Sequence, residues 1–407
     1  MSRPAIHSQG PECRRFKFAE HFIAPSGSRA PVTDWSNFFP LSLNVFSPNY
    51  TTPEAMNYNL TAQHEFVGNA VFSIGYVGAL GRHLIRTIEG NPITLAGQQA
   101  CLSNTGAEAG CPANGFQQHL AYPQNSVYPG NIFGSVGSPS TDGNSTYNAL
   151  QMSLNKGFGH GLGLLASRTR SHAIDDGSGF EDSGFQIRAM NPYPQFAYLN
   201  KGDSSYDARK RLVAGYTYRA PSFPGDHRLW NALVGGWQLS GITTFQSGFP
   251  VDISDSGYSS LTCDEFEYYD CSESPRQIAP LQTGDPRTDV YTNTSGKVVA
   301  HVLFNGPVTF SPATLGTFGG VARNSFHGSG LNTWDLALEK HIYFRPSYED
   351  QYLQLRLEAY NVFNHTQFCN TAGPFPCVNA NVESSTFGQV TTVNPSRLVQ
   401  LGAKFYF

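Results

Sequence analysis

Apolar and polar residues alternate with a period of two along much of the chain, which is typical of strands whose two faces meet different surroundings. In the stretch 351–363, for example, leucines alternate with the polar residues Gln354, Arg356 and Glu358. The same alternation predicts nine strands. They cover residues 57–65, 70–77, 145–156, 161–171, 207–219, 230–247, 331–344, 351–363 and 397–407.

The length of these stretches favours strands that cross a bilayer. Strands in soluble proteins are usually about 5–6 residues long, whereas a tilted transmembrane strand needs about 9–11. The polar face of each stretch suits a water-filled lumen, where side chains such as Gln354 and Arg356 form hydrogen bonds. No run of about 18 apolar residues occurs, which excludes a membrane-spanning helix. A large soluble β-sandwich with one wet face remains the alternative.

The connections between the predicted strands alternate strictly between short and long. In an up-and-down sheet, alternate connections lie at opposite ends, so all the long ones share one end, as in outer-membrane barrels with short periplasmic turns and long external loops. We therefore predict an all-β fold, part of an antiparallel up-and-down transmembrane β-barrel of about 9–11 long strands. The predicted short turns are 66–69, 157–160, 220–229 and 345–350, and the long loops are 78–144, 172–206, 248–330 and 364–396.

Composition agrees with a β-rich membrane protein. Charged residues make up 14% of the 407 residues, against about 25% in a typical soluble domain, and aromatic residues make up 13%. The net charge of −4 gives no indication of a nucleic-acid partner.

The seven cysteines favour an oxidising compartment. Six of them form three closely spaced pairs inside predicted long loops, and Cys13 is left over. Local disulfides would fasten such loops outside the cell, although chance clustering or metal ligation would also place cysteines close together. The predicted disulfides join Cys101 to Cys111, Cys263 to Cys271, and Cys369 to Cys377.

Six sequence blocks in order, among them "DARKRLVAGYTYRAP" and "GGWQLSGITTFQSGFPVDIS", resemble the C-terminal barrel of TonB-dependent receptors of the Oar-like type. The resemblance implies a bacterial outer-membrane transporter or receptor for a carbohydrate or peptide ligand. It implies a barrel domain over residues 46–407 and an irregular external segment over 1–45. TonB-type energy coupling would come only through an N-terminal plug domain, which the sequence does not contain.

Two observations lead us to expect that the chain is the C-terminal part of a longer barrel. The N-terminus lacks the apolar region of a signal peptide. Nine strands is an odd number, whereas bacterial single-chain barrels have an even number.

The chain ends in a strand that is similar to the signal read by the outer-membrane barrel-assembly machinery. The pattern is Gln400, Gly402, Phe405 and Phe407, with the last aromatic residue at the terminus. An unpaired strand edge with outward aromatic side chains suits an insertase that pairs with the edge and passes the strand into outer-membrane lipid.

Arg168 and Arg170 depart from the resemblance, because aromatic residues are usual there. An arginine on a lipid-facing side costs about 2–4 kcal/mol at mid-depth and about 0–1 near the interface. We expect both to lie at the external end, where they can meet lipid phosphates.

No catalytic motif is present, so we expect no enzyme activity and no cofactor. "AIDDGSGFEDSG" is interpreted as a solvated acidic loop rather than a Ca²⁺ site; its acidic residues are Asp175, Asp176, Glu181 and Asp182. The segment "CDEFEYYDC" (263–271) is interpreted as packing in a loop, with sugar stacking as the alternative. A secreted or periplasmic glycan-binding β-sandwich or surface adhesion protein is the second candidate function.

Overall fold

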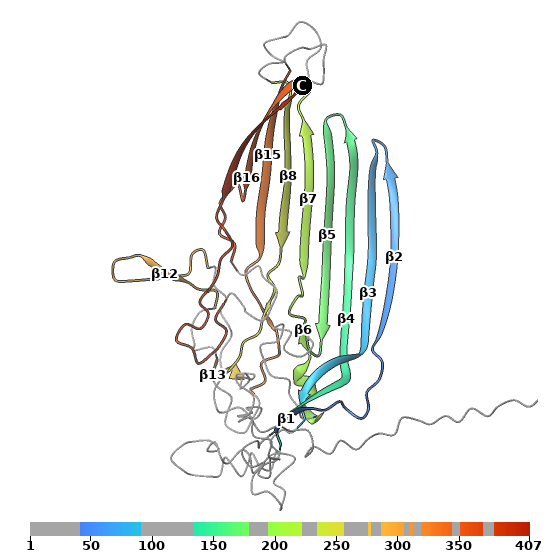
Figure 1. The fold of residues 1–407 in the computed structure, drawn as a ribbon, viewed down its shortest axis with the longest axis vertical. Helices are drawn as coiled ribbons and strands as arrows, with labels where there is room; N and C mark the ends of the chain where they lie inside the picture. The colour runs from blue at the N-terminus through green and yellow to red at the C-terminus, as the bar shows by residue number, and fades with distance from the viewer. Residues whose placement is uncertain are drawn as a thin grey trace, which may run out of the picture.

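The computed structural model describes residues 41–90, 133–178, 194–221, 234–255, 276–277, 286–304, 310–311, 319–343, 351–368 and 378–407. Nine long strands pair in chain order and antiparallel, forming one tall, curved sheet that is not closed (Figure 1). They are β2 (Glu54–Phe66), β3 (Ala70–Glu89), β4 (Phe133–Gly159), β5 (Leu162–Asp175), β7 (Lys210–Arg219), β8 (Trp237–Gln246), β15 (Leu331–Tyr343), β16 (Tyr352–Tyr360) and β17 (Leu398–Tyr406).

Shorter elements complete the described chain. Two of them join the main sheet: β1 (Leu41–Asn44) pairs with β4, and β6 (Gly202–Asp203) pairs with β5. Three small two-stranded pairs are separate from it: β9 (Pro250–Val251) with β14 (Phe326–His327), β10 (Arg276–Gln277) with β13 (Phe310–Ser311), and β11 (Val290–Thr292) with β12 (Val298–His301). A 3-10 helix covers Pro194–Asn200. No described helix is long and apolar enough to cross a membrane.

All nine predicted strands are confirmed, but β3 and β4 extend far beyond their predicted bounds. Strand β3 continues to Glu89 and β4 begins at Phe133, so both ends of the predicted loop 78–144 are strand. Their outer parts pair with two irregularities in register, on either side of Leu84. Apolar residues such as Leu84, Ile85 and Ile88 follow no period of two there, so the alternation that identified the other strands is lost.

The pairing register separates two kinds of face along the whole sheet. On one face, Leu357 of β16 lies between Leu338 of β15 and Leu401 of β17. On the other face, Glu358 lies between Ala337 and Gln400. Large apolar side chains on the first face are exposed, with Leu401 at 80%. We call the first face the outward face and the second the lumenal face, because a barrel wall needs one apolar side toward lipid and one polar side toward water.

Tight turns lie at one end of the sheet, which we call the short-turn end. The β2–β3 turn holds Gly68 and Asn69, and the β4–β5 turn holds His160 and Gly161, all with positive φ. Two consecutive positive φ values suit the twist of a two-residue hairpin. At Gly161 a Cβ would also lie 2.5 Å from the Arg219 carbonyl oxygen. The antiparallel order brings the end of β7, the end of β15 and the C-terminus to this same end (Figure 1).

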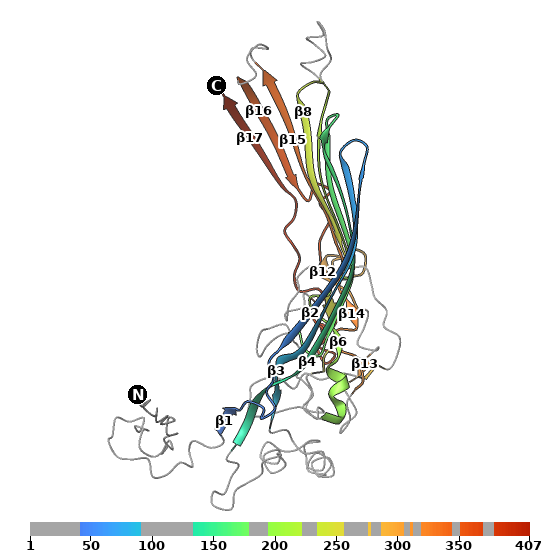
Figure 2. The same ribbon diagram turned by 90° about the vertical axis from the view of Figure 1, so that its right-hand side faces the viewer.

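The opposite end, which we call the long-loop end, carries all the predicted long connections, so the predicted loop topology is confirmed. Strands β3, β5, β8 and β16 leave the sheet there, and Figure 2 shows small strands such as β12, β13 and β14 beside the lower part of the tall sheet. In this view the sheet is curved, so that β16 and β17 lie apart from β2 and β3 at the short-turn end.

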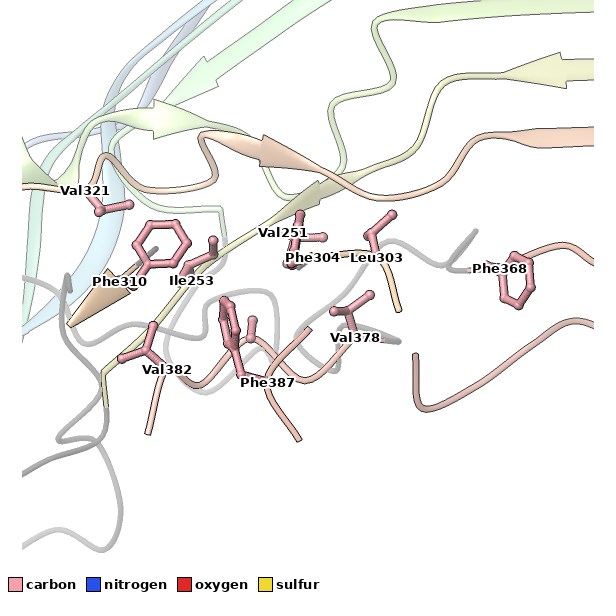
Figure 3. Packing of buried hydrophobic residues seen from close by; sticks show 11 residues of the cluster. Val251, Ile253, Leu303, Phe304, Phe310, Val321, Phe368, Val378, Val382 and Phe387 are labelled. Carbon is pink, nitrogen blue, oxygen red and sulfur yellow. The ribbon is translucent and has the colours of Figure 1, made fainter. Parts of the chain in front are cut away.

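The apolar core of the described chain lies at the long-loop end, not between sheets (Figure 3). Phe304 is fully buried, and its ring centroid lies 6.2 Å from that of Phe387. Phe310 packs edge-on against Phe326 at 5.7 Å. These side chains come from the β8–β15 and β16–β17 connections, so the two connections fold together into a packed layer, the loop layer. The buried members are Val251, Ile253, Leu303, Phe304, Phe310, Val321, Phe368, Val378, Ala380, Val382 and Phe387.

Candidate functional site

The lumenal face carries an ion-pair cluster near the short-turn end. Glu339 of β15 is buried and forms an ion pair with Arg356 of β16 at 3.2 Å. Arg356 also pairs with Glu358 at 2.5 Å. Gln354 donates a hydrogen bond to the Glu339 carboxylate at 2.8 Å and accepts one from the Tyr406 hydroxyl at 3.3 Å. The expected hydrogen bonding of Gln354, Arg356 and Glu358 is therefore confirmed.

This cluster is suited to the wall of an aqueous lumen. The Arg356 guanidinium pairs with two carboxylates, so the charges on this face compensate one another. Such a face can meet water and needs no apolar layer packed over it. The hydrogen bonds cross from β15 to β16 and from β16 to β17, so they also fix side-chain positions across three strands. The cluster contains no hydroxyl or thiol nucleophile hydrogen-bonded to a base, which acyl-transfer chemistry needs.

A second polar cluster, which we call the latch, is buried at the long-loop end. Asp175 ends β5 and is 3% exposed. Arg323 forms an ion pair with the Asp175 carboxylate and donates to Ser178 Oγ at 2.9 Å and to the Asn200 carbonyl oxygen at 2.8 Å. Ser204 also donates to Asp175. The latch thus joins the end of β5 to the β5–β7 and β8–β15 connections.

The expectation of a solvated acidic loop is wrong for Asp175. Burying a carboxylate requires a counter-charge, which Arg323 supplies from a segment distant in the sequence. Its neighbour Asp176 accepts hydrogen bonds from the backbone and side-chain nitrogens of Asn144 at 3.1 and 3.0 Å. Glu181 and Asp182 lie outside the described residues.

The latch continues into a charged group around Asp203 of β6. Arg209 pairs with Asp203 at 2.6 Å and with Asp207 at 2.5 Å, and His172 lies 2.8 Å from Asp203. Burial raises the pKa of Asp203, but hydrogen bonds from His172 and Arg209 outweigh it, so this pKa lies below its usual value. Burial holds the pKa of His327 below its ordinary value, which favours the neutral imidazole.

Among the described residues, one group of side chains has the spacing of metal ligands: His172, Asp203 and Asp207, whose ligand atoms lie within 4.8 Å of one another. Arg209 already bonds to both carboxylates. The guanidinium supplies the positive charge that a cation would bring, so we assign no metal here.

Another ion pair supports the long outer hairpin of β3 and β4. Arg86 donates to both carboxylate oxygens of Asp142, at 2.7 and 2.6 Å. The hydrogen bond from Arg86 lowers the pKa of Asp142 to about 2. A bidentate guanidinium–carboxylate contact of this kind joins the two strands across the extended hairpin, with Arg86 itself buried.

The predicted assembly signal lies on β17, whose only pairing within the described chain is with β16. Phe405 and Phe407 are exposed on the outward face, and their rings stack at 5.9 Å. A Cβ built on Gly402 would meet nothing within 4 Å, so packing of the described chain does not require glycine there. Gln400 lies opposite Glu358 on the lumenal face. Recognition by the assembly machinery remains a prediction.

The predicted disulfides stay predictions, because all seven cysteines, and the segment 263–271 with them, lie outside the described residues. Sequence reasoning missed the role of Arg323 and Arg209. Both fall in blocks that carried the family resemblance, "RNSFHGSG" and "DARKR", and that resemblance was the only signal for them.

A known protein family matches most of the chain, and several solved structures resemble it at low sequence identity. A family model described as "Outer membrane beta barrel domain" matches residues 5–400. No curated protein matches. The outer membrane transporter YddB from Escherichia coli is 10% identical to this chain, with a TM-score of 0.42. The match covers 90% of this chain and 34% of the YddB chain.

Two further solved structures resemble the chain at similarly low sequence identity. The ferripyoverdine receptor of Pseudomonas aeruginosa is 11% identical with a TM-score of 0.37, covering 87% of this chain and 27% of its own. The FrpB iron transporter from Neisseria meningitidis is 10% identical with a TM-score of 0.33, covering 89% and 33%. The chain therefore spans about a third or less of the length of these proteins. By its family match and its two-faced antiparallel sheet, the chain belongs to the outer membrane beta barrel domain family and is a protein of the bacterial outer membrane.

Proposed function

We propose that the chain forms part of the wall and the external loop layer of a TonB-dependent transporter of the Oar-like type, which takes up a carbohydrate or peptide ligand. The observation that carries the proposal is the division of the nine-stranded sheet into an exposed apolar face and a hydrogen-bonded polar face. A pore for a polar solute needs this division. The six sequence blocks that resemble Oar-like receptors support the transporter type.

The loop layer is the part of the wall best suited to meet a ligand. Its aromatic core holds the β8–β15 and β16–β17 connections together, and the buried Arg323–Asp175 pair fastens the first of these to the end of β5. Binding residues are often carried on loops that a rigid scaffold positions. We assign the chain no catalytic role and no cofactor, and we place recognition in this layer.

The second candidate, a soluble glycan-binding sandwich, is not favoured. A sandwich buries the apolar face of one sheet against a second sheet. Leu338, Leu357 and Leu401 instead share an exposed face, and no second sheet covers them among the described strands. Lipid is the medium in which such a face is stable.

Energy coupling would require an N-terminal plug domain, which the described strands do not include. The test therefore expresses the protein from its complete native gene, in cells with and without TonB. Labelled oligosaccharides and peptides are offered, and uptake is measured against cells in which the coding region is deleted. We expect uptake that needs both the gene and TonB. Uptake that needs the gene but persists without TonB would overturn energised transport and leave a passive pore.

A further inference from the structure

Three cations share the outward face near the long-loop end. Arg168 and Arg170 lie on β5 and Lys210 begins β7. The register sets Arg170 level with Leu150 and Lys210, and Arg168 level with Leu212. All three cationic side chains are exposed and stand on the same side as the apolar residues that face lipid.

Arg170 and Lys210 lie toward the outer edge of the apolar band, and Arg168 lies two residue steps deeper. Eight residue steps separate Leu162, at the short-turn end of β5, from Arg170. At about 3.3 Å a step and a tilt of about 45°, this is about 19 Å along the membrane normal, which is about 6 Å short of the far edge of an apolar band about 25 Å tall. Long arginine and lysine side chains can extend over such a distance to the interface. The row of Arg170 also contains Tyr76, and Tyr76 and Tyr58 both donate hydrogen bonds to Asn148, at 2.9 and 2.6 Å. Outward tyrosines of this kind mark the membrane–water boundary.

The outward lysines at the short-turn end have partners. Lys156 donates to the carbonyl oxygens of Gly159 and Leu162, at 3.2 and 2.9 Å. Lys340 donates to the Gly235 carbonyl oxygen at 2.5 Å and lies over the ring of Trp237. Both amines thus turn back to the backbone at the boundary, as snorkelling lysines do.

The guanidinium groups of Arg168 and Arg170 and the ammonium group of Lys210 differ from these lysines. They have no hydrogen bond or ion pair with any residue in the described parts of the chain. Three uncompensated positive charges side by side repel one another, so an external anion would stabilise the arrangement. The planar donor fork of arginine suits a phosphate in particular.

We propose that Arg168, Arg170 and Lys210 bind the phosphate group of an anionic lipid in the outer leaflet. The acyl chains of this lipid lie along the apolar surface of Leu212 and Phe245, which continues the same face toward the short-turn end. The site rests on the location of the chain in the outer membrane and not on its transport activity. Failure of the lipid test therefore leaves the proposed transporter untouched.

The test measures lipid binding to the full chain folded in neutral detergent micelles. Fluorescent phosphatidic acid is the probe, with phosphatidylcholine and inorganic phosphate as comparison ligands. The variant is Arg168→Gln/Arg170→Gln/Lys210→Gln, and the matched control is Arg211→Gln. Arg211 is the next residue after Lys210 and is also exposed, but it lies on the lumenal face.

We expect phosphatidic acid to bind more tightly than phosphatidylcholine, and free phosphate not to compete at millimolar concentration. Each cation removed should weaken binding about five-fold, so the triple variant should lose about 100-fold, while Arg211→Gln should lose nothing. If the triple variant does not fold, the single variants Arg168→Gln and Arg170→Gln should each bind phosphatidic acid about five-fold more weakly than wild type. Equal affinity of variant and wild type, an equal loss in Arg211→Gln, or full competition by free phosphate would overturn the lipid site.

Discussion

Removing the arginine of the latch should open the loop layer while leaving the barrel wall intact. In Arg323→Ala, the carboxylate of Asp175 loses its counter-charge but stays buried, with the Ser178 and Ser204 hydroxyls as its remaining partners. Breaking a buried pair by removing one partner costs about 3–5 kcal/mol. This loss should raise the opening equilibrium of the loop layer by about two to four orders of magnitude.

Hydrogen exchange measures this opening directly. In folded, detergent-solubilised protein, the amides of residues 319–327 and 173–178 should exchange much faster in Arg323→Ala than in wild type. Amides in the middle of β15 and β16 should not change, because ladder hydrogen bonds hold those strands independently. The matched control is the double variant Asp175→Asn/Arg323→Gln, which removes both charges and keeps polar groups in place, so its exchange should stay nearer to wild type.

Two results would refute the reasoning. If the amides of Arg323→Ala exchange at the wild-type rate, the ion pair does not hold the loop layer in place. Equal acceleration in the single and double variants would mean that the arginine acts by filling space and not by compensating the charge of Asp175.

Three further predictions use the same protein. Because burial lowers the pKa of His327, the loop layer keeps its full stability above the unfolded value of about pH 6.5 and loses stability as pH falls below it. Proteolysis of the loop layer should therefore accelerate between about pH 6.5 and 5, and less so in His327→Gln. Arg86→Gln should lower the free energy of unfolding by at most about 1 kcal/mol, since Asp142 is half exposed. In urea unfolding, the variant should lack the loss of stability between about pH 4 and 2 that protonation of Asp142 causes in wild type. Deleting Phe407 should reduce assembly in outer-membrane fractions far more than the heat stability of assembled barrel; equal effects would contradict a targeting role.

The sequence predicted the sheet well because every central strand meets lipid on one side and water on the other. That contrast imposes the alternation of Leu353, Leu355 and Leu357 with polar residues, and it fixes the register to the nearest residue. In the β3–β4 extension around Arg86 and Asp142 the alternation disappears, and the pattern of apolar residues predicts a loop there instead of strands.

The latch could not be predicted for a different reason. Whether Asp175 is solvated or buried depends on Arg323, and nothing local in either segment specifies the other. The loop layer presents the same difficulty: Phe304 and Phe387 lie in irregular segments whose apolar residues have no period. Long-range packing of this kind follows from the folded arrangement and not from local pattern.

The central claim is that one face of the sheet meets lipid and the other meets water, and quenching of fluorescence along β16 tests it most directly. Single tryptophans at positions 353 to 358, in a chain whose native tryptophans are replaced by phenylalanine, are measured in liposomes with brominated lipid and with aqueous iodide. We predict that brominated lipid quenches at positions 353, 355 and 357 and that iodide quenches at 354, 356 and 358. Quenching by iodide at every position, with none by brominated lipid, would contradict the account.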